Sequence, residues 1–306
     1  MKWKSIFVAI SLACASAMSM AWDAVPVRVD EGVYAFVGET GPRTLANEGM
    51  NATTGFIVTD AGVVVIDSGS SAQVARKIAA AIRAVTDRPI RYVINTGGQD
   101  HRWLGNGHFA DLGISVLASE KTAADIAERG GAQAAGLDQL LGAAFIGTRI
   151  QSPTRRIALR ETLTLGGERI ELIFAGGGHT PGDLIVWLPR QRVAFAGDIV
   201  YLDRLLGVLP VSNVKNWLAS FDALAALQPR IVVPGHGAPA TLDKARKETR
   251  DYLARLRGHM KKAVDAGDDI QAAIQSLDDR EHAYLAVYPE LRGPNASRAY
   301  LEAEME

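Results

Sequence analysis

Three residues of metal-ligand type, far apart in the chain, each stand beside a hydrophobic, strand-like run. They are His179, Asp198 and His236, framed as Gly-Gly-Gly-His-Thr-Pro-Gly-Asp, Ala-Phe-Ala-Gly-Asp and Val-Val-Pro-Gly-His-Gly. Glycines allow tight turns and close backbone approach, so each framed side chain can be fixed at the end of a strand. Because a divalent transition metal needs imidazole and carboxylate groups that are already held in place, the pattern predicts a metal site.

Each of these residues has a simpler explanation when taken alone. His179 could be satisfied within its own turn, and Asp198 could be a helix cap or a turn former. The same glycine-framed arrangement occurs three times, and this repetition favours metal binding. Asp183, four residues after His179, is expected to accept hydrogen bonds from that histidine or from its turn. His108, His259 and His282 lie outside such loops and are expected to be surface or packing residues.

The elements that must position these side chains are strands and helices in alternation. A hairpin is predicted over residues 56–66, with its turn at Asp60-Ala-Gly. Apolar residues at helical spacing predict an amphipathic helix over residues 71–85, which Pro89 stops. Further strands are expected at residues 91–95, 114–117, 157–165, 169–174, 184–188, 193–196 and 231–233, and further helices at 121–145, 218–227 and 242–264.

Two strand-rich halves with helices between and after them predict the fold class. Such a chain is expected to form an α/β fold in which two mixed sheets pack face to face and helices cover them outside, an αββα sandwich. Residues 40–54 are rich in Gly, Pro and Asn and predict an irregular loop over the site. The sequence shows no internal linker and no repeat of fixed period, so residues 22–306 are expected to form a single domain.

The first 21 residues have the organisation of a secretory signal peptide. Lys2 and Lys4 precede an apolar stretch, and small residues follow before Trp22. A membrane anchor would need about 20 consecutive apolar residues. Cys14 raises the alternative of a lipoprotein, but Ser11 stands where a lipid-attachment signal usually has leucine. We therefore expect a periplasmic or secreted protein with no stable membrane anchor after signal removal.

Composition restricts the partners of the mature chain. Without the signal segment it has no cysteine, so it can form no internal disulfide. Loss of the two signal lysines changes the formal net charge from −1 to −3. A mildly acidic chain without a long Lys/Arg run argues against nucleic acid as a partner and favours a small-molecule substrate.

Taken together, the motifs resemble the metallo-β-lactamase superfamily over residues 33–236. The likeness rests on a strand that ends in Asp67, on Gly-His-Thr-Pro-Gly-Asp at 178–183, on Gly-Asp at 197–198 and on Pro-Gly-His at 234–236. The chain is most similar to secreted quinoprotein relay system zinc metallohydrolases, at 87–90 leading into Asn-Thr at 95–96 and at 295–304. The resemblance implies an αββα sandwich with a metal site at one edge of the two sheets.

The histidine-rich motif of that family is degenerate in this chain. Its usual form, Thr-His-x-His-x-Asp-His-x-x-Gly-Asn, corresponds to Thr-Gly-Gly-Gln-Asp-His-Arg-Trp-Leu-Gly-Asn at 96–106. Without gaps, Gly97 and Gln99 replace two histidines, His101 replaces the aspartate and Arg102 replaces the last histidine. A register shifted by one position would restore Asp100-His101 but would need length changes on both sides. His101 faces the site in both registers.

Ligand number then predicts one metal ion rather than two. A two-metal site needs about six protein ligands, and the chain has lost two imidazoles from one position. We expect one ion held by His101, Asp198 and His236, with His179 nearby or as a fourth ligand. Zinc is the expected ion, with manganese or iron as alternatives.

The same comparison gives each residue near the ion an expected role. Asp198 and His101 are the predicted catalytic residues, because the bound ion would lower the pKa of water to about 7. Gln99 and Arg102 are the predicted substrate-binding residues. Arg102 could clamp an anionic group of the substrate, or it could pair with Asp67 or Asp100 and keep its loop rigid.

Two functions from different classes stay open on these observations. The first is a secreted, metal-dependent hydrolase that uses one ion to activate water. The second is a non-catalytic relative that has lost the metal and binds a small anionic ligand. A β-lactamase proper is a third and weaker hypothesis, because the scaffold is known to serve lactams, thioesters, lactones and phosphoesters.

Overall fold

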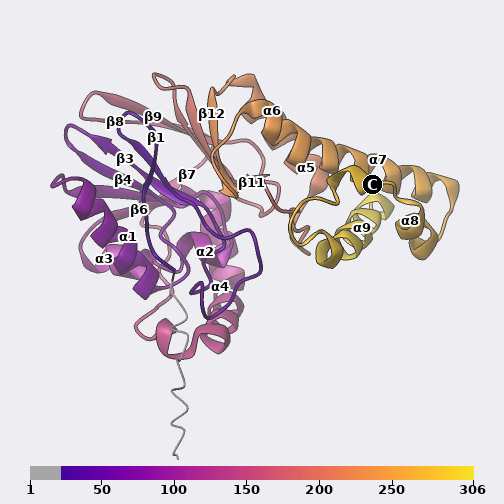
Figure 1. Ribbon diagram of the computed structural model, residues 1–306, viewed down its shortest axis with the longest axis horizontal. Helices are drawn as coiled ribbons and strands as arrows, with labels where there is room; N and C mark the ends of the chain where they lie inside the picture. Colours follow the sequence, from indigo (N-terminus) through magenta and orange to yellow (C-terminus); the bar gives the residue numbers. More distant parts are fainter. Residues whose placement is uncertain (1–21) are drawn as a thin grey trace, which may run out of the picture.

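The computed structural model describes residues 22–306, so the predicted signal peptide lies outside the described residues. Two sheets form its centre (Figure 1). The larger sheet has the order β1-β2-β3-β4-β5-β6-β7. Its strands are β1 Val27–Asp30, β2 Val33–Phe36, β3 Thr54–Thr59, β4 Gly62–Ile66, β5 Ile90–Ile94, β6 Ser115–Ser119 and β7 Arg155–Ile157.

The smaller sheet has the order β12-β11-β10-β9-β8. Its strands are β8 Arg160–Leu165, β9 Glu168–Phe174, β10 Leu184–Leu188, β11 Val193–Tyr201 and β12 Ile231–His236. Both sheets are mixed, because β1 to β4 pair antiparallel and β4 to β7 parallel, while β11 and β12 are the parallel pair of the smaller sheet.

Helices follow or connect the strands. They are α1 Ala72–Val85, α2 Asp100–Trp103, α3 Asn106–Asp111, α4 Glu120–Leu141, α5 Val214–Ala226, α6 Leu242–Ala245, α7 Asp251–Ala266, α8 Ile270–Ser276 and α9 Tyr288–Glu304. Short turns of other helix types cover Gly142–Phe145, Arg246–Arg250 and Arg280–His282. No helix within residues 22–306 is both long and apolar enough to cross a bilayer.

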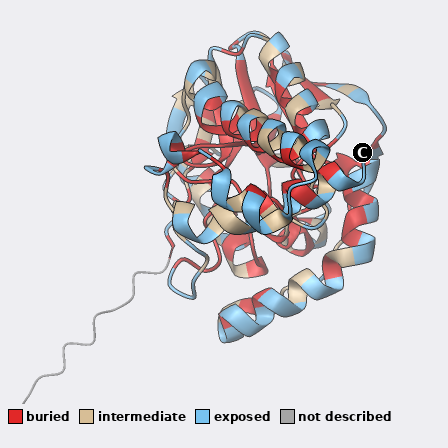
Figure 2. Ribbon diagram, turned by 90° about the vertical axis from the view of Figure 1, so that its right-hand side faces the viewer, coloured by how far each residue is buried: buried red, intermediate tan, exposed pale blue. Residues whose placement is uncertain are grey.

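Apolar layers lie between the two sheets and on the outer face of each sheet. Between the sheets, Ile57 and Ile66 of the larger sheet pack in one cluster with Phe195 of the smaller sheet. Because side chains alternate along a strand, neighbouring residues such as Val65 point outward and meet Ile78 of α1. Figure 2 shows the resulting pattern, in which buried residues line the inside and helices are exposed on their outer faces. The predicted αββα sandwich is confirmed.

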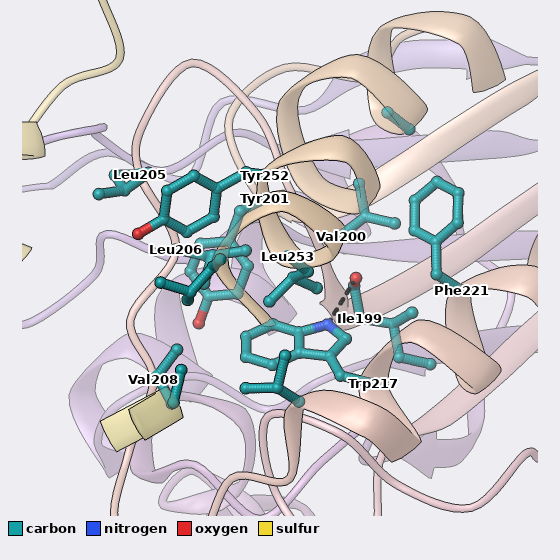
Figure 3. Packing of buried hydrophobic residues seen from close by; sticks show 14 of the residues in the cluster. Ile199, Val200, Tyr201, Leu205, Leu206, Val208, Trp217, Phe221, Tyr252 and Leu253 are labelled. Atoms are coloured by element: carbon teal, nitrogen blue, oxygen red, sulfur yellow. Dashed lines mark hydrogen bonds between the residues drawn. The ribbon is translucent and has the colours of Figure 1, made fainter. Parts of the chain in front are cut away.

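On the outer side of the smaller sheet α5 packs against β11, α7 packs against α5, and α9 packs against α7. Trp217 and Phe221 of α5 and Tyr252 of α7 pack here. Figure 3 shows this packing, with the Trp217 indole N–H donating to the Ile199 carbonyl at 2.9 Å. Figure 1 places α7, α8 and α9 together at one end of the molecule. The sequence did not predict α8, and residues 295–304 gave only a likeness where α9 is found.

Two strand predictions were wrong, and the second of them concerns the site. The single strand predicted over 157–165 is divided between β7 of the larger sheet and β8 of the smaller sheet. The sequence indicated that the strand over 193–196 ends before Asp198, but β11 continues to Tyr201. Gly197 has a φ of 50°, and the register against β12 shifts on both sides of it. The glycine therefore marks an irregularity within the strand, because the apolar run resumes after Asp198. Asp198 consequently lies inside a strand and not in a loop.

Candidate metal centre

Three of the four predicted metal ligands converge at one edge of the two sheets. Asp198 comes from β11, His236 is the last residue of β12, and His101 lies on the short helix α2 that follows β5. One ligand atom from each of these residues lies within 4.8 Å of the others. The Nε2 atoms of His101 and His236 are 3.4 and 3.3 Å from the carboxylate oxygens of Asp198.

Both histidines of this cluster are neutral, and His236 presents an unprotonated nitrogen to the site. Burial lowers the pKa of His101 and that of His236, so both imidazoles are neutral at neutral pH. The Nδ1–H of His236 donates to the Asn51 carbonyl at 2.7 Å, which leaves the Nε2 lone pair free. Neither Nε2 has a hydrogen-bond partner, although both atoms are buried.

These orphaned nitrogens fit a metal ion. Two neutral imidazoles and one carboxylate match the His₂-carboxylate ligand set of some catalytic zinc sites, which leave a fourth position for water. A buried nitrogen without a partner is otherwise costly, so a ligand that satisfies both nitrogens at once would remove that cost. The donor atoms and the tautomer of His236 therefore suit one divalent transition metal.

His179 lies beside this cluster but is not part of the three-residue group. Its Nδ1–H donates to the Gly207 carbonyl at 3.0 Å, and the Tyr201 hydroxyl donates to its Nε2 at 3.3 Å. Burial lowers the pKa of His179 to about 4 and raises that of Tyr201 well above its usual value. We expected His179 either to lie near the metal or to be its fourth ligand, and these hydrogen bonds favour the first of the two.

Arg102 requires a correction. We expected it either to clamp a substrate anion or to pair with Asp67 or Asp100. The guanidinium is fully buried and donates to both oxygens of Asp198, at 3.1 and 2.6 Å, and to Asp67 at 3.0 Å. Its other two N–H groups donate to the carbonyls of Thr53 and Gly235.

All five donors of Arg102 are therefore occupied, and none remains for a substrate. Arg102 therefore forms ion pairs and does not clamp a substrate. Its partners are Asp67, as expected, and Asp198 in place of Asp100. Burial by itself would raise the pKa of Asp198, but the Arg102 cation reverses this and holds that pKa well below the usual range. Asp198 thus stays ionised next to the two imidazoles.

At Gly97, where the motif of the family has a histidine, a neighbouring side chain fills the space. At Gly97 an added Cβ would lie 2.7 Å from the Asp183 carboxylate, so Asp183 takes the space a side chain would need. Asp183 accepts hydrogen bonds from the backbone and hydroxyl of Thr180 and so supports the turn after His179, one of its two predicted roles. Burial raises the pKa of Asp183 to about 8.

The two asparagines that flank the degenerate motif bond to each other. The side chains of Asn95 and Asn106 exchange hydrogen bonds at 3.0 and 2.8 Å. His101 belongs to the three-residue cluster, as both registers expect, and the Arg102 guanidinium contacts Asp198. That choice of register remains a prediction about the family, but both flanking asparagines stand where it needs them.

A cavity of about 230 Å³ opens next to the three-residue cluster. Its walls include His101, His179, His236 and Gln99, and Gln99 has a buried, unpaired Oε1. The predicted loop 40–54 supplies two wall residues; the wall as a whole comprises Arg43, Asn51, Gln99, His101, His179, Tyr201, Arg204, Gly207, Leu209, His236 and Leu291.

Sequence reasoning missed several wall residues, and Tyr201 and Arg204 are the polar ones among them. Tyr201 stacks on His236 with ring centroids 4.4 Å apart and contacts His179. The available signal was its position three residues after Asp198 on the same strand, which the early predicted strand end concealed. Arg204 carried no local signal, because its segment between β11 and α5 has no regular structure.

Comparison with known proteins now assigns the family. The model of the metallo-beta-lactamase superfamily matches residues 48–236. This chain belongs to the metallo-beta-lactamase superfamily. The matched segment contains the three-residue cluster, Arg102 and His179.

Two curated relatives illustrate the range of this superfamily. Metallo-beta-lactamase IND-1 of Chryseobacterium indologenes is 24% identical over 215 residues, which cover 69% of this chain and 80% of that protein. The linear primary-alkylsulfatase of a Pseudomonas species is 21% identical over 244 residues, which cover 67% of this chain. This chain spans only 46% of the alkylsulfatase.

Solved structures of both kinds share the fold. The metallo-beta-lactamase from Pontibacter korlensis has a TM-score of 0.61 and 22% identity, covering 74% of this chain and 97% of that chain. The sec-alkylsulfatase Pisa1 from a Pseudomonas species has a TM-score of 0.70 and 18% identity, covering 90% of this chain and 50% of that chain. At these identities the likeness concerns the fold alone.

Proposed function

We propose that this protein is a metal-dependent hydrolase that uses one metal ion, held by His101, Asp198 and His236, to act on a small molecule. The observation that carries the proposal is the buried three-residue cluster with two orphaned imidazole nitrogens. When bound, such an ion polarises a substrate oxygen and supplies hydroxide near neutral pH. Membership of a superfamily that contains lactamases and alkylsulfatases supports hydrolysis as the reaction class.

The surrounding residues have distinct tasks in this proposal. Asp198 and His101 are the predicted catalytic residues because they lie at the reacting centre. The neutral imidazole of His179 accepts a hydrogen bond from Tyr201, and both side chains line the cavity, so this pair can hold or pass a proton at Nε2. Gln99, with its unpaired Oε1, remains the predicted contact for a donor group of the substrate.

The proposal extends to the metal, the place of action and the subfamily. Zinc suits two imidazoles and a carboxylate, and manganese and iron accept the same ligands. The signal-type segment at residues 1–21 supports export to the periplasm or beyond. The motifs at 87–96 and 295–304 support a place near the quinoprotein relay system zinc metallohydrolases.

Metal content tests the proposal directly. Protein purified after supplementation with zinc, manganese or iron should contain about one equivalent of one metal by elemental analysis. The His236→Ala variant should lose it, because a ligand is removed. The matched control is His108→Ala, which removes an imidazole outside the cluster and should leave the metal content unchanged. Wild-type protein with less than about a tenth of an equivalent would contradict the proposal.

Activity gives a second and independent test. A panel of nitrocefin, a thioester, a lactone and an alkyl sulfate samples one lactam and three kinds of ester. Hydrolysis of any member by the wild type and the His108→Ala control, together with its loss in His236→Ala, supports the proposal. Equal rates for the His236→Ala variant and the wild type would place the reaction elsewhere.

The second candidate function, a non-catalytic anion-binding relative, is favoured by one specific observation. The Arg102 guanidinium already neutralises Asp198 through both oxygens, which weakens the attraction of this carboxylate for a dication. For such a relative, anions should raise the melting temperature of metal-free protein, and zinc should not raise it. Stabilisation by zinc that disappears in His236→Ala would favour the hydrolase.

A further inference from the structure

Arg204 is a buried cation without a carboxylate partner among residues 22–306. Its side chain lies in the segment after β11, and the residue is only 8% exposed. Its Nη1 donates to the Gly41 carbonyl at 3.0 Å, and its Nε is buried without any hydrogen-bond partner. No Asp or Glu oxygen of the described residues lies within ion-pair distance of it.

The contrast with Arg102 shows what this arrangement lacks. Arg102 is completely buried, but its five N–H groups are all satisfied and two carboxylates balance its charge. Arg204 has one carbonyl partner and no carboxylate within ion-pair distance among the described residues. Burial lowers the pKa of Arg204 and the nearby Arg43 cation adds to this effect, while the more distant charge of Asp198 acts against it. Burying a charge without a counter-ion destabilises the fold, so a bound anion would reduce this free-energy cost.

The position of Arg204 indicates which anion would supply this charge. Arg204 lines the same cavity as His101, His179 and His236. The cavity wall contains a second arginine, Arg43, and no Asp or Glu. Arg43 is already paired with Asp100 at 2.5 Å, which leaves Arg204 as the cation of the wall that lacks a carboxylate partner within the described part of the chain. A ligand in reach of the metal cluster is therefore also in reach of Arg204.

The apolar residues of the wall and the volume of the cavity indicate the size and the non-ionic part of the ligand. Leu209 and Leu291 contribute apolar surface, and Leu291 comes from α9, in the C-terminal region that the sequence left largely unpredicted. The volume of about 230 Å³ lies below the range of roughly 300–1,000 Å³ that is usual for drug-sized ligands. The cavity therefore suits a small molecule, or one end of a longer one, with an apolar part and an oxyanion.

We propose that Arg204 is a substrate-binding residue that holds a terminal oxyanion, a sulfonate, sulfate or carboxylate group, of a small amphiphilic substrate in the cavity beside His101, His179 and His236. The guanidinium is suited to this because it can offer two parallel N–H groups to two oxygens of one anion. The identification of the ligand as a substrate rests on the proposed hydrolase function, whereas the anion site itself does not depend on the metal.

Calorimetric titration of metal-stripped protein tests the anion site without the metal. The probes are butane-1-sulfonate, butyrate and, as a neutral analogue of the same shape, butyl methyl sulfone. We expect at least one of the two anions to bind roughly tenfold or more tightly than the sulfone, the difference given by about one charge-assisted hydrogen bond. The stronger of the two anions identifies the oxyanion that the site prefers.

Three variants assign the effect to Arg204. Arg204→Met should abolish the preference for anions over the sulfone, and Arg204→Lys should keep part of it, because the charge remains. Arg76→Met is the matched control, since Arg76 is an exposed arginine on α1 outside the cavity, and it should bind as the wild type does. If Arg204→Met does not fold, comparing the binding of anion and sulfone by the wild type and by Arg204→Lys still tests the anion site.

The outcomes separate this inference from the proposed function. Equal binding of anions and sulfone by the wild type, or an unchanged preference in Arg204→Met, overturns the anion site. Metal content, measured on the same preparations, reports on the hydrolase independently. If the protein prefers anions but takes up no metal, the anion site stands and the hydrolase proposal is refuted. If it takes up metal but does not prefer anions, the hydrolase proposal stands and the anion site is refuted.

Discussion

The Arg102→Met substitution tests whether a buried cation holds the centre of this fold together. Methionine keeps much of the length of arginine but removes the guanidinium and its five hydrogen bonds. Asp198 and Asp67 are both almost completely buried and would lose their only cationic neighbour within ion-pair distance among residues 22–306. The site would then contain two uncompensated carboxylates.

The expected loss in the free energy of unfolding follows from this geometry. Breaking a buried ion pair by removing one partner typically costs about 3–5 kcal/mol. Because one guanidinium serves two carboxylates here, we expect a loss near the upper end, about 5 kcal/mol at neutral pH. That is a large part of the roughly 5–15 kcal/mol by which a domain is usually stable.

The pH dependence makes the prediction sharper. In the wild type, the pKa of Asp198 is held well below its usual value, so its contribution to stability is present at neutral pH and is lost on strong acidification. Burial already raises the pKa of Asp67 to about 6 with Arg102 present. Without Arg102, burial raises the pKa of Asp67 further and also raises that of Asp198 above its value in the unfolded chain. A carboxylate with a raised pKa destabilises the fold when ionised, so the variant should regain stability as the pH falls from about 7 to about 5.

Urea denaturation followed by circular dichroism measures both effects. The control is Arg250→Met, which removes a partly exposed arginine paired with Asp222 at 2.6 Å. That variant should lose at most about 1 kcal/mol, because surface ion pairs contribute little. A loss of under about 1 kcal/mol for Arg102→Met, or a pH dependence like that of the wild type, would refute this account of the buried pair.

Three further predictions follow from the same region. Gly97→Ala should destabilise the protein by about 1–3 kcal/mol, since its Cβ would lie 2.7 Å from an Asp183 oxygen. Gly131→Ala, with nothing within 4 Å of the new Cβ on α4, should instead stabilise it by about 0.5–1 kcal/mol; both changes are measured by urea denaturation, and equal effects would contradict the steric argument. Because burial raises the pKa of Asp183 to about 8, its proton stabilises the fold at low pH, and stability should fall as the pH rises from about 6 to about 8, by at most about 1.4 kcal/mol per pH unit. Unfolding curves of Asp183→Asn should lack this slope, and a slope that persists would assign it to another group. Tyr201→Phe should lower the rate of hydrolysis of any substrate found while leaving the metal content intact, because it removes the hydroxyl that donates to His179; metal loss in this variant would instead make Tyr201 part of the metal centre.

The sequence predicted most of the fold because its signals are local. Helical spacing indicated α1, the turn at Asp60-Ala-Gly indicated the β3-β4 hairpin, and the structure contains both. The framed residues Asp198 and His236, together with His101, were predicted to converge, and their ligand atoms do lie together. The extension of β11 was missed because a glycine interrupts a strand in the same way that it ends one.

What the sequence alone determined about this protein is the sandwich, the edge at which its site lies and the types of side chain available there. Only the tertiary structure decided what those side chains do, because charges pair with whatever long-range neighbours the fold brings to them. Arg102 meets Asp198 from 96 positions away and so is a buried structural cation, whereas Arg204, without any local signal, lines the cavity with no carboxylate partner among the described residues. Local patterns specify backbone conformation and facing, but ion pairing depends on separations in space that no local pattern encodes.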